Sequence, residues 1–149
     1  MKFIKLQNYL QFSLILAILV LMWGCGSNGG TGTNGITSKS ASVSVIPSES
    51  GEYIIQGNNM DGVAGIDLTM NYDSTVMSSP TVTQGGFISG AKMATNTTLP
   101  GIIRIAIIMI PPLSGSGQIA TVSFAAQLGA AGITITSVKL IDNKGALVP

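Results

Sequence analysis

The chain has 149 residues, enough for one domain with a leader, and charged residues make up only 9% of it. It contains no histidine and a single cysteine, Cys25, so neither an internal disulfide nor a cysteine-based metal site can form. Without the leader residues Lys2 and Lys5, five basic residues stand against six acidic ones, a net charge of −1. No basic patch remains that could follow phosphates, which argues against nucleic acid as a partner.

The first residues have the features of an export signal. Lys2 and Lys5 precede an apolar run over 12–23, which is shorter than the ~20 residues of a membrane-spanning helix and typical of a secretory signal. The run ends in LMWGC, which resembles the lipobox of bacterial lipoproteins, where the cysteine thiol takes a diacylglyceryl group. We therefore expect a signal peptide over 1–24, acylation of Cys25, and a lipid anchor at the outer membrane or cell surface. An ordinary signal peptide with a chance cysteine, or an uncleaved anchor, are the alternatives.

Residues 25–40 predict a tether. Gly, Ser, Thr and Asn dominate this stretch and leave almost nothing to bury. A flexible chain of this length has a root-mean-square reach on the order of 20 Å, which would hold a module just clear of a bilayer.

The remaining residues, 41–149, predict an all-β domain. Short segments of alternating or apolar residues are separated by Gly, Pro and Asn turns, a pattern typical of an antiparallel β-sandwich. The expected strands are 41–47, 52–56, 66–73, 81–84, 91–97, 102–110, 118–127 and 132–140. The side chains expected in the core are Ile66, Leu68, Met70, Tyr72, Ile105, Val122 and Phe124.

The segment 62–73, GVAGIDLTMNYD, is the centre of this domain. From Ile66 onward apolar and polar residues alternate strictly, which predicts a strand with one buried and one exposed face. Asp73 then precedes 74–77, where its carboxylate is expected to cap a short helical turn.

Strand 102–110, IIRIAIIMI, is apolar on both faces except at Arg104. If Arg104 faces outward, Ile108 and Ile110 do too, and they form an apolar stripe that invites a partner. If a second layer covers both faces, there is no such stripe. Because both sets are apolar, the sequence leaves this choice open.

Catalysis is not expected. Asp67 and Asp73 are six positions apart along one strand, roughly 20 Å, whereas glycosidase carboxylates lie ~5–9.5 Å apart. Asp61 lies in a Gly-rich turn, where aspartate usually serves the turn itself. The chain is therefore predicted to be no enzyme.

Several segments, in order, resemble the cohesin modules of cellulosome-type assemblies. These are GVAGIDLTMNYD with its following turn, PGIIRIA at 100–106, SGSG at 114–117 leading into IATVSF, and 133–142. The resemblance implies a jelly-roll sandwich that binds a dockerin module. It also implies that the calcium ions belong to the dockerin, so that this domain needs no cofactor and no metal. One departure is that the family's last strand, which pairs with the first, is shortened or missing here.

The same resemblance implies a binding face. Gly65, Asp67 and Thr69 would face the partner's recognition helix, and the loop Ser114, Gly115, Ser116 would border it. The alternative is that Asp67 is a solvated strand aspartate without a partner.

Two other functions remain open. A carbohydrate-binding module shares a related sandwich, but such modules stack sugars on exposed aromatic rings, and residues 41–149 hold only Tyr53, Tyr72, Phe87 and Phe124. If the domain were a carbohydrate-binding module, polysaccharide would be its partner. The third reading is a purely structural surface module.

Overall fold

The computed structural model describes residues 39–129 and 131–149. The predicted signal peptide, Cys25 and most of the tether lie outside these residues. Eight strands and one 3-10 helix follow in chain order: β1 Ser42–Pro47, β2 Tyr53–Asn58, β3 Val63–Tyr72, β4 Met77–Gln84, η1 Gly86–Ile88, β5 Lys92–Asn96, β6 Ile102–Ile108, β7 Gly117–Gln127 and β8 Ile133–Asp142. No helix within the described residues is long and apolar enough to cross a membrane.

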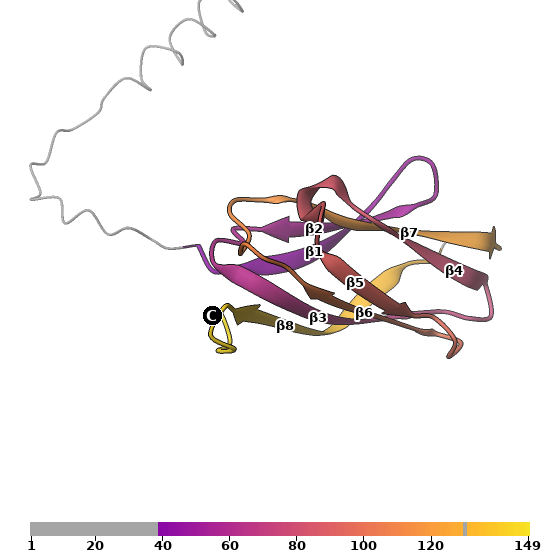
Figure 1. Cartoon of the computed structure of the whole chain (residues 1–149). Helices are drawn as coiled ribbons and strands as arrows, with labels where there is room; N and C mark the ends of the chain where they lie inside the picture. Colours follow the sequence, from indigo (N-terminus) through magenta and orange to yellow (C-terminus); the bar gives the residue numbers. More distant parts are fainter. Residues whose placement is uncertain (1–38, 130) are drawn as a thin grey trace, which may run out of the picture. The chain divides into compact units, whose positions relative to one another are not determined.

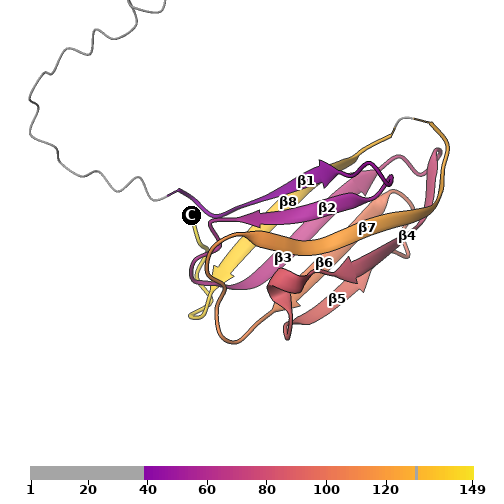
Figure 2. The same ribbon diagram turned by 90° about the horizontal axis from the view of Figure 1, so that it is seen from above.

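The strands form two four-stranded sheets, ordered β1-β2-β7-β4 and β5-β6-β3-β8. Every pair is antiparallel. Figure 1 shows the two sheets stacked face to face, and in Figure 2 β1 lies over β8 and β2 over β3. The predicted all-β antiparallel sandwich is confirmed.

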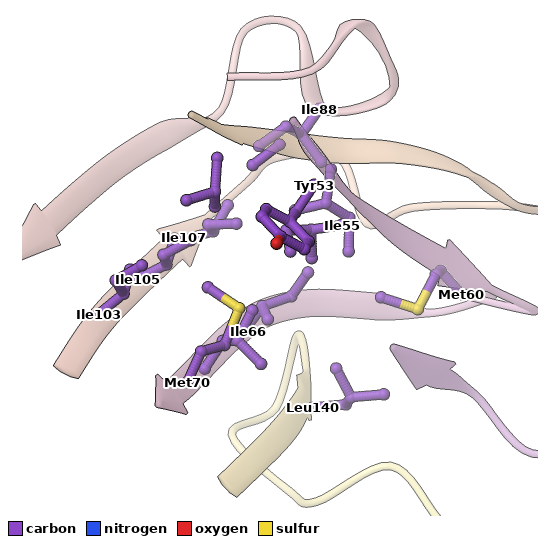
Figure 3. Close-up of a cluster of buried hydrophobic side chains, with 14 of the residues drawn as sticks. Tyr53, Ile55, Met60, Ile66, Met70, Ile88, Ile103, Ile105, Ile107 and Leu140 are labelled. Carbon is purple, nitrogen blue, oxygen red and sulfur yellow. The ribbon is translucent and has the colours of Figure 1, made fainter. Parts of the chain in front are cut away.

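Alternating residues of both sheets meet in one core (Figure 3). Of the predicted core residues, Ile66, Leu68, Met70, Ile105 and Val122 are buried. The prediction was wrong in degree for two aromatic residues, because Tyr72 and Phe124 are only half-buried. Tyr72 is the last residue of β3, so the two rings pack against each other at the rim, with centroids 5.0 Å apart.

Both Ile119 and Ala120 of β7 are buried, although neighbours in a regular strand point to opposite faces. The register explains this: Ile55 pairs with Ala120 and Gln56 with Gln118, so Ile119 is an extra residue on β7. Such a bulge turns one side chain from the exposed to the buried set.

The turn after β3 is capped by Asp73, as predicted. Its Oδ1 accepts hydrogen bonds from Thr75 N at 2.9 Å and Thr75 Oγ1 at 2.6 Å, and its carbonyl accepts from Met77 N at 2.9 Å. A single helical turn forms over 74–76, since Val76 N also donates to Asp73 O, at 3.3 Å. It ends where β4 begins, at Met77, which is buried and pairs with Gln127, so the strand starts four residues earlier than expected.

No further strand lies beside β1 among the described residues. The last residues pair instead with β8: Leu147 bridges Ile141, and Val148 N donates to Leu140 O at 2.8 Å. Within the described residues β1 is thus an edge strand, paired with β2 alone.

Candidate functional site

One sheet surface carries most of the predicted binding residues. We call it the outer face: the outward side chains of β5-β6-β3-β8, against which no other described strand or helix lies (Figure 1). The register arranges these side chains in rows across the strands. The rows are Lys92, Ile108, Gly65 and Ile141; then Ala94, Ala106, Asp67 and Lys139; then Asn96, Arg104, Thr69 and Ser137.

The orientation of β6, which the sequence left open, is now defined. Ile103, Ile105 and Ile107 are buried, while Arg104, Ala106 and Ile108 alternate with them and are exposed. Arg104 therefore faces outward, and the apolar stripe exists at its end: Ile108 is 67% exposed and Ile110, just beyond β6, is 94% exposed. No second layer covers this strand within the described residues.

Asp67 lies at the centre of the outer face. It is exposed, and across the strands it stands opposite Ala106 on β6 and Lys139 on β8. Directly opposite residues in such a pair have Cβ atoms about 4.5–5.5 Å apart. Since Ala94 and Ala106 are small, the carboxylate stands on a flat surface on the β5 side, where another molecule could approach it.

Next to Asp67 the outer face is hollowed. The hollow has a volume of about 490 Å³ and is walled by Ile108, Ile110, Pro112 and Ile141, with Gly65 on its floor. Asp142 and Asn143, which follow Ile141, also line it. A Cβ added at Gly65 would lie 3.4 Å from the Cβ of Ile141, an ordinary contact, so glycine is not required here by the backbone. Its effect is to leave the hollow open.

The loop Ser114, Gly115, Ser116 is fixed to the start of β3 through Asp61. The Oδ1 of Asp61 accepts hydrogen bonds from Ser114 Oγ at 2.7 Å and Gly115 N at 2.9 Å, and these bonds hold the pKa of Asp61 below its ordinary value. Ser116 Oγ accepts from Asn59 N at 2.9 Å. Asp61 was expected to serve its own turn, but its carboxylate holds the neighbouring loop instead.

These bonds place the loop at the rim of the outer face. Leu113, just before the loop, exchanges backbone hydrogen bonds with Gly62 and Val63, two to three residues before Gly65. Ser114 itself lines a second hollow of about 260 Å³, on the side of η1. The structure therefore brings Gly65, Asp67, Thr69 and Ile108 together on one surface, and sets the serine loop at its end.

The outer-face residues of β5 and β8 could not be assigned from the sequence. Lys92, Lys139 and Ile141 come from β5 and β8, and their positions depend on how those strands pair with β6 and β3. The alternation of 132–140 could have indicated that Lys139 faces away from Leu140. Ile141 lies beyond the predicted end of that strand.

The described residues offer little for other chemistry. Across 39–129 and 131–149, no group of three or more His, Cys, Asp or Glu side chains could hold a metal ion. Tyr53 is buried, and its hydroxyl donates to Ala131 O at 2.6 Å and accepts from Gln127 Nε2 at 2.8 Å. None of the outward positions that we paired across β5, β6, β3 and β8 is aromatic, so that surface presents no ring for stacking on a sugar.

The fold and this surface define a class: an antiparallel β-sandwich module whose β5-β6-β3-β8 sheet has an outer face that no described strand or helix covers. The comparison with family models is specific, because the cohesin domain model matches residues 31–146. The chain belongs to the cohesin family. A search of curated protein sequences gives no match.

Solved structures agree in fold. A type II cohesin domain from the cellulosome of Acetivibrio cellulolyticus superposes with a TM-score of 0.63 at 14% identity, over 74% of this chain and 88% of that one. The cohesin–dockerin complex Coh-OlpA-Doc918 of Clostridium thermocellum gives 0.61 at 14% identity, over 74% and 92%. A non-cellulosomal cohesin from the archaeon Archaeoglobus fulgidus gives 0.57 at 20% identity, over 66% and 71%.

Proposed function

We propose that this module binds a dockerin-bearing protein through the outer face, with Asp67 as the central acceptor. It acts by binding and not by catalysis. Two observations support the proposal: the cohesin family membership, and structural neighbours that were solved as cohesin–dockerin complexes. The observation that carries it is the line of Gly65, Asp67 and Thr69 along β3 on the outer face, with Ile108 opposite Gly65.

The physical case rests on the surroundings of Asp67. A helix can lie across the small residues Ala94 and Ala106 and donate a hydroxyl or amine hydrogen to the carboxylate. A charge-assisted hydrogen bond of this kind contributes about 1.5–3 kcal/mol. Burial of Ile108 and of the hollow around Gly65 adds the apolar part of the binding free energy.

The test is calorimetry with dockerin modules encoded in the same genome. Asp67→Ala should weaken binding roughly tenfold to a hundredfold, because each 1.4 kcal/mol is a factor of ten in affinity. Glu49→Ala, which removes one exposed carboxylate from the β1–β2 turn, is the matched control and should bind like the wild type. Equal affinity of the Asp67→Ala and wild-type proteins would remove Asp67 from the site.

We expect calcium to act through the partner. A chelator should then abolish binding while the circular dichroism of this module stays the same.

Sugar binding is the second candidate, because the half-buried pair Tyr72 and Phe124 keeps some aromatic surface at the rim of the sandwich. If no dockerin binds and the module is retained by insoluble cellulose or another glycan, this second function is correct.

We further propose that the module is a lipoprotein, acylated at Cys25 and held at the outer membrane or cell surface. The support is the apolar run over 12–23 that ends at the only cysteine of the chain. Cys25→Ala should release the protein from membranes or block its processing. Unchanged membrane partitioning, together with no lipid mass on the wild type, would refute the anchor.

A further inference from the structure

The outer face carries a net positive charge, although the domain as a whole has a net negative charge. We propose that it selects a dockerin helix that is acidic and carries one apolar anchor side chain, which enters the hollow over Gly65. This inference rests on the proposed function and specifies the partner's chemistry.

The charge distribution is the first observation. The strands of the β1-β2-β7-β4 sheet contain no charged residue at all. The charged strand residues belong to the other sheet: Lys92, Arg104 and Lys139 against Asp67 point outward there, and Asp142, at the end of β8, lines the hollow. The outer face with its hollow therefore carries three basic and two acidic side chains, a net charge of +1, whereas residues 39–149, with five basic and six acidic side chains, carry −1.

The spacing of these charges shows that Asp67 does not neutralise them. Lys139 stands directly opposite Asp67, and Arg104 is its diagonal neighbour at about 7–8 Å. Lys92 lies on the far strand β5, and with strands about 4.8 Å apart the three cations span roughly 15 Å. The Asp67 carboxylate lies beside Lys139, so Arg104 and Lys92 still face solvent without a partner from this strand. Arg104 and Lys92 are farther from each other than the Debye length, which is about 8 Å at physiological salt.

The hollow is the second observation. Ile108 and Ile110 are among the most exposed large apolar side chains of the described residues, and both line it. Fully burying one such side chain contributes about 1.5–3 kcal/mol. Because Gly65 leaves the floor open, an apolar side chain from a partner can enter between Ile108 and Ile141 and cover them.

Together the two observations set a pattern on the partner helix. The hollow lies in the row of Gly65, and Arg104 lies in the row of Thr69, four residues further along β3, or about 13 Å. A helix rises about 1.5 Å per residue, so it covers this distance in roughly nine residues. A partner helix would fit the hollow and the cations if it carried an apolar anchor side chain and, on the same helix face, aspartate or glutamate between one turn and two and a half turns away.

The test is association kinetics with the dockerin modules encoded in the same genome, at 50 mM and 500 mM NaCl. Electrostatic steering raises association rates in a salt-dependent way, so the rate should fall at least tenfold at high salt. The double variant Lys92→Glu, Arg104→Glu should lower it similarly at 50 mM salt. Lys39→Glu, a single charge reversal before β1 on the other sheet, is the control for each single variant, Lys92→Glu or Arg104→Glu, and should stay within about twofold of the wild type.

Gly65→Leu tests the anchor, because a leucine there would fill the hollow without a backbone clash. It should reduce affinity at least tenfold while the circular dichroism spectrum is retained. A dockerin whose acidic helix residues are changed to lysine should recover binding to the double charge variant.

The outcomes separate the two levels of the argument. If dockerins bind, but the association rate is unaffected by salt and by the double charge reversal, the acidic-partner inference is overturned and the proposed function stands. Dockerin binding that survives Gly65→Leu overturns the anchor. If no dockerin binds at all, the proposed function fails, and this inference fails with it.

Discussion

Two adjacent glycines between β4 and β5, Gly85 and Gly86, are expected to respond in opposite ways to the same substitution. At Gly85 the backbone N donates to Ile119 O at 2.7 Å, and an added Cβ would lie 2.8 Å from the carbonyl carbon of Gln118 and closer still to its oxygen. These are backbone atoms of β7, so they cannot turn aside as a side chain could. At Gly86 an added Cβ would meet nothing within 4 Å.

The magnitude follows from this difference. Forcing extra volume into a packed site costs typically 1–3 kcal/mol, and a rigid obstacle favours the upper end. With a urea m-value of about 1–3 kcal/mol/M, Gly85→Ala should lower the unfolding midpoint by roughly 1–2 M. Gly86→Ala should leave it unchanged or raise it, because alanine restricts the unfolded chain and gains about 0.4–1 kcal/mol where the backbone permits it.

Urea titration followed by far-UV circular dichroism measures both variants against the wild type. The wild-type ellipticity before the transition is the control for a retained fold. If the urea midpoint of Gly85→Ala lies within about 0.5 M of that of Gly86→Ala, the close approach of Gly85 to β7 does not limit the stability of this domain.

Three further outcomes are expected. Leu68→Ala, at a fully buried position, should cost about 2–5 kcal/mol of unfolding free energy by urea titration. Tyr53→Phe should cost about 0.5–1.5 kcal/mol, because the Tyr53 hydroxyl's bonds to Gln127 Nε2 and Ala131 O are lost while Gln127 itself is exposed. The pKa of Asp61 is lowered in the folded state, so its contribution is present above the unfolded value of about 3.9 and is lost as pH falls through the folded pKa. The midpoint temperature of thermal unfolding should therefore fall less steeply between pH 5 and pH 2 for Asp61→Asn than for the wild type. An identical slope for the two proteins would contradict this role of Asp61.

Much of the fold could be predicted from period-two patterns, because burial of one sheet face selects residues along a strand directly. Ile66, Leu68 and Met70 were identified this way. The bulge that buries Ile119 could not be, because it is a property of how β7 pairs with β2 and not of β7 alone.

Core residues in turns were missed for a related reason. Met60 and Ile88 are fully buried, yet they lie in short connections where no alternation marks the inward side. Their burial follows from long-range packing: Met60 N donates to Gly115 O at 2.7 Å across two connections. No pattern local to either segment encodes that meeting.

The site divides in the same way. Gly65, Asp67 and Thr69 share a strand, so their common side could be predicted from spacing. Lys92 joins them only through the pairing of β5 with β6. The net positive charge of the outer face therefore became visible only once the strand order was known.

The alternation within β3 has a consequence for how such modules diverge. The inward residues of β3 stabilise the sandwich, and its outward residues lie on the proposed contact surface. Stability and partner binding therefore depend on different, alternating positions of one ten-residue strand. Substitutions at Gly65, Asp67 and Thr69 can accumulate without loosening the core behind them. A library randomised at these positions, with Ile66 and Leu68 kept, should yield folded proteins at high frequency and new partner preferences among them.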